Sequence, residues 1–202
     1  MDESLRTPPQ PPKEPDEPQL TSGEALRQDL YLWLQTMAFA LAALILIFTF
    51  VGRVVGVDGS SMEPTLQDGD LLLLQSIGYT PKQGDVVVLT KPFAHVTGAI
   101  VKRVIATEGQ RVEIDYEAGT VTVDGVVLDE PYLPEAMVEP SPATFETITS
   151  VTVPEGHIFV MGDNRNHSDD SRDTRLGTVD TRYVLGRAVA VLLPAGHFGW
   201  IE

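Results

Sequence analysis

Hydrophobic and polar positions divide the chain into three stretches. Residues 1–20 hold six prolines among charged and polar residues, so they offer too little apolar surface to fold and we expect a disordered tail. The next stretch, residues 30–52, is 23 residues long and carries no charge. From Val54 onward, short aliphatic and β-branched runs alternate with Gly, Pro and Asp, a pattern typical of strands joined by turns.

The uncharged stretch, Leu30–Gly52, predicts one transmembrane helix within residues 21–53. A helix of about 20 apolar residues crosses the hydrocarbon core of a bilayer. A cleavable signal peptide would open with a short basic segment, whereas an acidic tail comes before this stretch, and a buried core helix would show a polar face. Arg27 and Arg53 flank the stretch on opposite sides, so charge does not decide its orientation.

Residues 54–202 predict a mostly β domain. Asp124-Gly125, between two short aliphatic runs, predicts a hairpin because both positions favour the positive φ of a type I′ turn. The proline-bearing stretch Asp129–Thr144 predicts a loop, and residues from about 112 to 155 predict a small inserted subdomain. The predicted strands are Asp70–Leu74, Asp85–Leu89, Gly98–Ala106, Gln110–Asp115, Thr120–Val123, Val126–Leu128, Thr147–Val153, His157–Met161 and Tyr183–Leu193.

Composition narrows the classes of function. The formal net charge of −15 argues against nucleic acid as a partner. The chain has no Cys, which excludes a disulfide framework and a thiolate zinc site, and it has no glycine-rich phosphate loop. We therefore expect neither a metal nor a cofactor.

The octapeptide Gly59–Leu66 contains two adjacent serines and is a candidate nucleophile site. Pro64 fixes its own φ, and Gly59 permits backbone conformations that other residues disfavour. Apolar neighbours on either side would place a hydroxyl beside an apolar pocket. An ordinary Gly/Pro turn between strands explains the octapeptide equally well, and a serine needs a base.

Lys102 is the strongest candidate base. The four histidines, His95, His157, His167 and His197, lie in no informative frame. Strand alternation places Lys102 on one face with Ile100 and Val104, so its amine would be surrounded by aliphatic side chains. If desolvation lowered the pKa of Lys102 by about 3 units, the lysine would be a useful base near neutral pH. The alternative is an edge-strand lysine that extends into solvent.

The segment Met161–Arg172 predicts a structured polar loop. A calcium loop would need a glycine and a bidentate glutamate that do not follow Asp163 at the right spacing, and two arginines would oppose the cation. Arginine–carboxylate pairs within the loop would hold Ser168, whose hydroxyl is suited to bonding a neutral lysine. A solvated turn is the alternative.

The order of these segments resembles type I signal peptidase, the bacterial leader peptidase, in its compact form with a single membrane anchor. The shared motifs follow the membrane helix as Gly-x-Ser-Met-x-Pro-Thr-Leu, Gly-Asp-Val-Val-Val, Lys-Arg-Val and Gly-Asp-Asn-Arg-x-x-Ser-x-Asp-Ser-Arg. The likeness extends to Gly186–Val189 and leaves out only the proline-rich tail and the C-terminal end.

The resemblance implies a serine peptidase in which Ser61 is the nucleophile and Lys102 the general base, without a histidine or a metal. The Ser61 N–H would bind the oxyanion, and Gly59 stands where some members supply a serine hydroxyl. Ser60 matches no catalytic position. The positions that match supporting residues are Ser168, Asp170, Arg172 and Arg103.

The family also implies fold, substrate and location. We expect antiparallel β-sheets, secreted preproteins with small residues at the first and third positions before the cut, a cytoplasmic tail, and residues 54–202 outside the plasma membrane. Phe198, Trp200 and Ile201 either rest on the bilayer surface or complete the core. The neighbourhood of the nucleophile predicts a substrate pocket lined by Val57, Met62, Leu66 and Val101.

Our interpretation is a membrane-anchored endopeptidase with a Ser61–Lys102 dyad that removes signal peptides. Two alternatives stay open. A self-cleaving Ser–Lys regulator would be soluble with a DNA-binding module, and a catalytically inactive, membrane-tethered binding module would keep only the scaffold. The sequence does not predict the oligomeric state.

Overall fold

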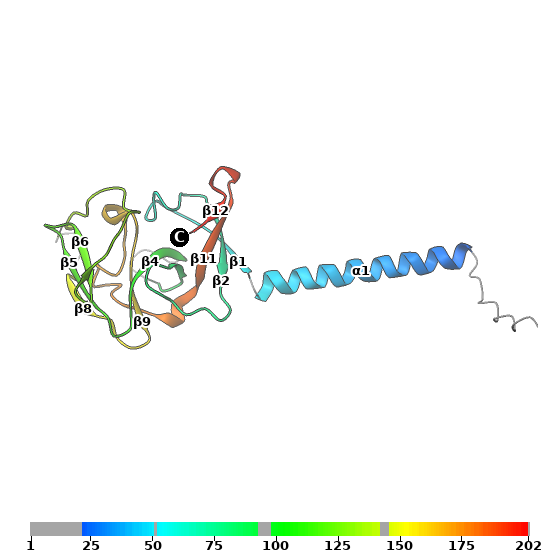
Figure 1. Cartoon of the computed structure of the whole chain (residues 1–202), viewed down its shortest axis with the longest axis horizontal. Helices are drawn as coiled ribbons and strands as arrows, with labels where there is room; N and C mark the ends of the chain where they lie inside the picture. The colour runs from blue at the N-terminus through cyan, green and yellow to red at the C-terminus, as the bar shows by residue number, and fades with distance from the viewer. Residues whose placement is uncertain (1–21, 51, 93–97, 142–145, 202) are drawn as a thin grey trace, which may run out of the picture. The chain divides into compact units, whose positions relative to one another are not determined.

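The computed structural model describes residues 22–50, 52–92, 98–141 and 146–201. The predicted tail, residues 1–20, lies outside the described residues. The chain divides into two units, one ending at Leu44 and the other beginning at Ile45, and each is described by itself. A single long helix, α1 (Ser22–Phe50), spans that boundary, and all the strands belong to the second unit (Figure 1).

Helix α1 begins at Ser22, at one of the two hydroxyl residues that precede the apolar stretch, and has Glu24 in its first turn, where an acidic side chain complements the helix dipole. Its segment Leu26–Leu46 is 21 residues long, has a mean hydropathy of 1.6 and buries none of its side chains within the protein. By length and composition, this is the one helix among the described residues that could cross a membrane.

Two antiparallel sheets make up the second unit (Figure 1). The large sheet has the order β1 (Gly52–Gly56), β2 (Leu71–Gln75), β11 (Val184–Leu193), β3 (Val86–Leu89), β4 (Ile100–Thr107), β9 (His157–Met161) and β10 (Val179–Asp180), and β12 (Gly199–Trp200) pairs with β11. The small sheet has the order β7 (Val126–Val127), β6 (Thr120–Val123), β5 (Arg111–Asp115) and β8 (Ser150–Thr152). The described 3₁₀ helices are η1 (Arg165–His167), η2 (Thr181–Tyr183) and η3 (Ala195–His197).

The predicted fold class, a mostly β protein of antiparallel sheets with one N-terminal helix, is confirmed. All nine predicted strands occur, with ends that move by up to three residues. The predicted hairpin has φ of 52° at Asp124 and 81° at Gly125, as a type I′ turn requires. The prediction missed β1, β10 and β12, because two of them are only two residues long and β1 starts inside the stretch assigned to the helix.

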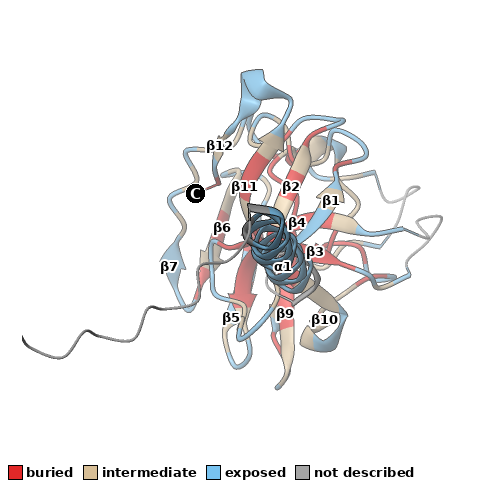
Figure 2. Cartoon of the chain, turned by 90° about the vertical axis from the view of Figure 1, so that its right-hand side faces the viewer, coloured by how far each residue is buried: buried red, intermediate tan, exposed pale blue. Residues whose placement is uncertain are grey.

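Hydrophobic side chains form three clusters, and buried residues gather along the strands of the large sheet (Figure 2). The first cluster joins β2, β3 and β11 to the chain between β1 and β2. It includes Ile201, which is 9% exposed, whereas Phe198 and Trp200 are 70% and 81% exposed. Of the three C-terminal residues, Ile201 therefore completes the core, and the two aromatic side chains are exposed, which leaves the prediction that they rest on the bilayer surface open for them.

Strand β4 is buried from Val101 to Ala106, so apolar clusters cover both of its faces. The predicted alternation would have buried only one face. The reason is that β4 contributes side chains to all three clusters. Lys102, which is 3% exposed, lies in this interior.

Candidate active site

The turn that carries Ser61 lies in the connection between β1 and β2. Met62 and Leu66 anchor it in the first cluster, and the Leu66 N–H donates to the Met62 carbonyl at 2.9 Å. Gly59 has a φ of 97°, where a side chain would be strained, and its N–H donates to the Asp68 carboxylate at 2.9 Å. The backbone on both sides of Ser61 is therefore fixed.

Lys102 reaches this turn from β4. Its Nζ donates to Ser61 Oγ at 2.6 Å, although the two residues are 41 positions apart in the sequence. Burial lowers the pKa of Lys102 to about 8, and the nearby carboxylates of Asp170 and Asp169 only partly oppose the shift. The alternative of a lysine that extends into solvent is wrong, since Lys102 is only 3% exposed.

The polar loop after β9 is built around the buried carboxylate of Asp170. This carboxylate accepts hydrogen bonds from the Gly162 N–H at 3.0 Å and Ser168 Oγ at 2.7 Å, and from Arg172 Nε at 2.8 Å. Burial alone would raise the pKa of Asp170, but the Arg172 guanidinium and these hydrogen bonds outweigh burial and lower it. The Ser168 hydroxyl donates to Asp170, and the described bond of Lys102 Nζ goes to Ser61.

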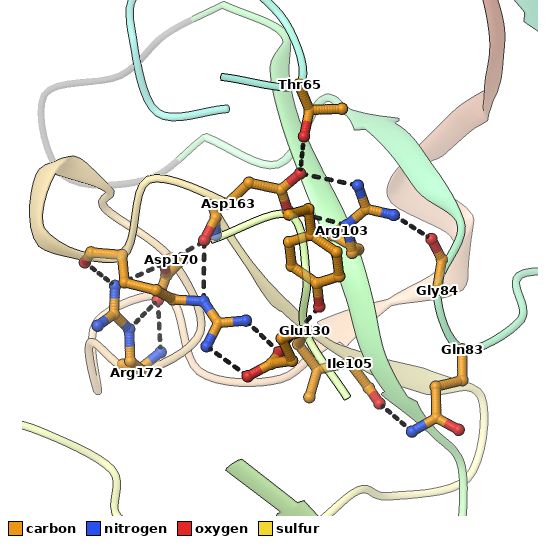
Figure 3. A network of polar contacts seen from close by, with 12 residues as sticks. Thr65, Gln83, Gly84, Arg103, Ile105, Glu130, Asp163, Asp170 and Arg172 are labelled. Carbon is orange, nitrogen blue, oxygen red and sulfur yellow. Dashed lines mark hydrogen bonds and ion pairs between the residues drawn. The ribbon is translucent and has the colours of Figure 1, made fainter. Parts of the chain in front are cut away.

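Asp163 joins the same loop to the strand and to the serine turn (Figure 3). Its carboxylate accepts from Arg103 Nε at 2.9 Å and Arg103 Nη2 at 2.8 Å, and from Thr65 Oγ1 at 2.6 Å. Arg103 also donates to the Gly84 carbonyl. The sequence interpretation assigned no role to Asp163, although an acid directly after a buried strand is a usable signal.

Gly162 is a second residue that the sequence interpretation missed. A Cβ atom here would lie 2.3 Å from Ser168 Oγ and 2.4 Å from the Ser61 carbonyl oxygen. Only glycine lets the loop approach the serine turn this closely. The approach is completed by Asn164, whose N–H donates to the Ser61 carbonyl and whose side-chain amide donates to the Ser60 carbonyl, both at 3.1 Å.

The remaining candidate bases lie elsewhere or outside the described residues. His95 belongs to the latter group. Among the described residues, no group of three His, Cys, Asp or Glu side chains is placed to hold a metal ion. The imidazole rings of His157, His167 and His197 contact the Glu155 carbonyl, the Asn164 side chain and the Asp70 carboxylate.

Comparisons with known proteins identify the family of the chain. The family model described as "Signal peptidase, peptidase S26" matches residues 30–193. The chain belongs to the signal peptidase family. It is 31% identical to signal peptidase I of Mycobacterium tuberculosis H37Rv, over 93% of this chain and 79% of the relative. It is 35% identical to signal peptidase I of Bacillus licheniformis, over 83% and 91%.

A probable signal peptidase I of Synechocystis is 37% identical over 79% of this chain and 81% of the relative. A crystal structure of a signal peptidase I from Enterococcus faecalis V583 is 33% identical and covers 55% of this chain and 98% of its own, with a TM-score of 0.44. The protein is thus a signal peptidase, a hydrolase that cleaves signal peptides from secretory preproteins.

Two features of this signal peptidase bear on its chemistry. Within the described chain, the Ser61 N–H donates no hydrogen bond, whereas the Gly59 N–H is bound to Asp68. The Ser61 N–H is therefore available for a developing negative charge. The predicted pocket residues lie together in the first cluster, and all are at most 8% exposed: Val57, Met62, Leu66 and Val101.

Proposed function

We propose that this signal peptidase is a membrane-anchored serine endopeptidase that uses Ser61 and Lys102 as a catalytic dyad. The observation that supports the dyad best is the 2.6 Å contact between Lys102 Nζ and Ser61 Oγ inside a buried site. With a pKa of about 8, roughly a tenth of Lys102 is neutral at pH 7, against less than about a thousandth for a lysine in water.

In the proposed reaction, neutral Lys102 takes the proton of Ser61 as Oγ attacks the scissile carbonyl. The Ser61 N–H stabilises the resulting oxyanion, and Lys102 passes its proton to the leaving amine when the peptide C–N bond breaks. Lys102 then activates a water molecule that hydrolyses the acyl-enzyme and restores Ser61. Ser168, Asp170, Arg172 and Arg103 hold the surrounding loop.

An extended substrate has a place to bind beside the dyad. Ile100, Val101 and Lys102 pair with β3 on one side, whereas the pairing of β4 with β9 begins only at Arg103. Among the described strands, the second edge of these three residues is open, and an extended peptide adds readily to such an edge. The expected preference for small residues before the cut is the one that the resemblance to the family implies.

We further propose that α1 crosses the plasma membrane, with residues 1–20 cytoplasmic and residues 54–202, the peptidase domain, on the outer side. The length of the apolar segment supports the crossing, and the orientation is the one that the resemblance to the family implies. Because the native chain has no Cys, the variants Ser4→Cys and Ser150→Cys each place one thiol on one side of the proposed anchor. A membrane-impermeant maleimide should label only Ser150→Cys in intact cells. Labelling of Ser4→Cys would contradict the topology.

The dyad is tested with the detergent-solubilised chain and a synthetic peptide that carries Ala-x-Ala before the cut. Ser61→Ala and Lys102→Ala should abolish turnover with the fold intact, and a serine-acylating penem should modify the peptide that contains Ser61. Two controls match these changes, Ser60→Ala and Lys91→Ala, and both should stay active. Full activity of either dyad variant would disprove the proposal.

A catalytically inactive binding module is the second candidate, and it predicts no acylation of any serine. A self-cleaving regulator predicts fragments of the chain itself with no added peptide. Mass spectrometry of the same samples distinguishes all three, because an intact chain with an adduct on Ser61 fits only the endopeptidase.

A further inference from the structure

Two side chains from the loop after β7 hold the arginines that surround the candidate site. The Tyr132 ring lies under the Arg103 guanidinium, 4.0 Å from its centre, and the Tyr132 hydroxyl donates to Glu130 Oε1 at 2.8 Å. Glu130 in turn accepts hydrogen bonds from both terminal nitrogens of Arg165. The side chains of Glu130 and Arg165 are only 6% and 1% exposed, so the ion pair is shielded from water.

The two arginines converge on Gly162 and Asp163. Arg165 Nε donates to the Gly162 carbonyl at 3.1 Å, and Arg103 makes its two bonds to the Asp163 carboxylate. The same two loop residues touch the serine turn, Gly162 through the Ser61 carbonyl and Asp163 through Thr65. A continuous set of contacts therefore runs from the loop after β7 to the nucleophile turn.

We propose that Tyr132 and Glu130 are positioning residues that set the distance between Ser61 and Lys102. This inference rests on the proposed dyad. Arg103 follows Lys102 directly on β4, so its grip on Asp163 fixes the loop relative to the base, while Arg165 fixes the backbone of Gly162, which lies against Ser61. Without the Tyr132 ring and the Glu130 carboxylate, both guanidinium groups lose partners, and the loop gains freedom to move.

The test compares substitutions at two tyrosines. Tyr132→Leu removes the ring and the hydroxyl, and Tyr132→Phe keeps the ring under Arg103. Tyr79→Leu is the matched control, because the Tyr79 hydroxyl also donates to a carboxylate at 2.8 Å, that of Asp85, while its ring packs against the third cluster. Each variant is assayed as the full chain in detergent, with kcat, KM and their pH dependence measured, and the melting temperature is recorded.

We expect Tyr132→Leu to lower kcat about tenfold, below the roughly 100-fold loss that a 1 Å misplacement can cause, and to change KM less than twofold. Its acidic pH limb should move to higher pH, because a looser site admits water to Lys102. Tyr132→Phe should recover most of kcat, and Tyr79→Leu should keep the wild-type kcat and pH profile even if its melting temperature falls. Glu130→Gln, which leaves Arg165 without a counter-charge, should resemble Tyr132→Leu.

Three outcomes would overturn the inference in distinguishable ways. A wild-type kcat and pH profile for Tyr132→Leu, alongside an inactive Lys102→Ala, would refute the positioning role and leave the dyad standing. Equal losses of kcat for Tyr132→Leu and Tyr79→Leu at equal melting temperatures would reduce Tyr132 to general stability. An active Lys102→Ala would refute the dyad, and the positioning role would fail with it.

Discussion

The two sheets differ in the kind of side chain that they bury. In the small sheet, β5 and β6 alternate strictly between buried and more exposed positions, and every side chain they bury is aliphatic. In and around the large sheet, ten polar or charged side chains are buried: Asp70, Asp85, Lys102, Arg103, Asp163, Arg165, Asp170, Ser171, Arg172 and Asp173.

The buried polar groups show where the protein loses folding stability in order to place charged side chains in its interior. Burying a charge is unfavourable unless partners compensate for the lost hydration. Asp163 and Asp170 have arginine partners with close hydrogen bonds, whereas Lys102 faces a neutral serine hydroxyl. Lys102 is thus the group whose charge is compensated least directly, which suits its proposed role as the base.

The largest effect should come from Lys102→Met, which keeps a similar volume without the amine. We expect peptide cleavage to fall by on the order of 10⁴-fold or more, since the base is lost. The pKa of Lys102 is about 8 in the folded protein and 10.5 in the unfolded chain, so keeping this lysine protonated makes the folded wild type less stable. The variant should therefore be more stable than the wild type, by up to about 3 kcal/mol below pH 8.

The sign of that gain follows from proton binding. Between pH 8 and 10.5 the unfolded wild-type chain binds the additional proton, so wild-type stability rises with pH and the advantage of Lys102→Met shrinks. Unfolding in detergent, followed at pH 7 and pH 9, checks both statements. An unchanged or lower stability of Lys102→Met at pH 7 would contradict the burial argument.

Asp163→Asn should come next, since it removes the carboxylate that accepts two hydrogen bonds from the buried Arg103 guanidinium. We expect a loss of about 3 kcal/mol in the free energy of unfolding, together with reduced turnover. The matched control is Asp180→Asn, whose partner Arg182 has a side chain that is 87% exposed, and it should unfold like the wild type. Chemical denaturation of both variants provides the comparison.

The pH dependence should be the next in size. Protonated Lys102 accepts no proton, so kcat/KM should rise with pH and level off above about 8, with roughly a 50-fold increase between pH 6 and pH 8. The measurement is kcat/KM for peptide cleavage in overlapping buffers at constant ionic strength. A midpoint near 6.5 would instead indicate a histidine base.

The smallest expected effect is that of Val121→Ala, a cavity in the core between the sheets. The lost apolar contacts should cost about 2 kcal/mol of unfolding free energy, without a shift in the pH profile. Thermal unfolding and peptide cleavage measured on the same sample test this separation. A changed pH profile would show that packing within the small sheet alters the pKa of Lys102 by a route other than the contacts of Glu130 and Tyr132.

The strands of the small sheet could be predicted from the sequence because burial of one face makes apolar and polar positions alternate with a period of two, as in Arg111–Asp115. Aliphatic surroundings were predicted for Lys102, but the complete burial of β4 was not, since the clusters on its two faces are assembled from distant parts of the chain. The contact between Thr65 and Asp163 joins residues 98 positions apart and leaves no local pattern. The resemblance to the family predicted that Ser168, Asp170 and Arg172 lie together at the site. Glu130 and Tyr132 belong to no motif in the sequence, so no role was predicted for them.

The close approach at Gly162 has a practical consequence. Any side chain there, even a methyl group, must push the loop away from the Ser61 carbonyl, while the serine, the lysine and all their supporting side chains remain chemically unchanged. We therefore expect Gly162→Ala to lose cleavage but to keep the open strand edge that is proposed to bind the substrate. Such a variant would hold an uncut preprotein long enough for the complex to be isolated.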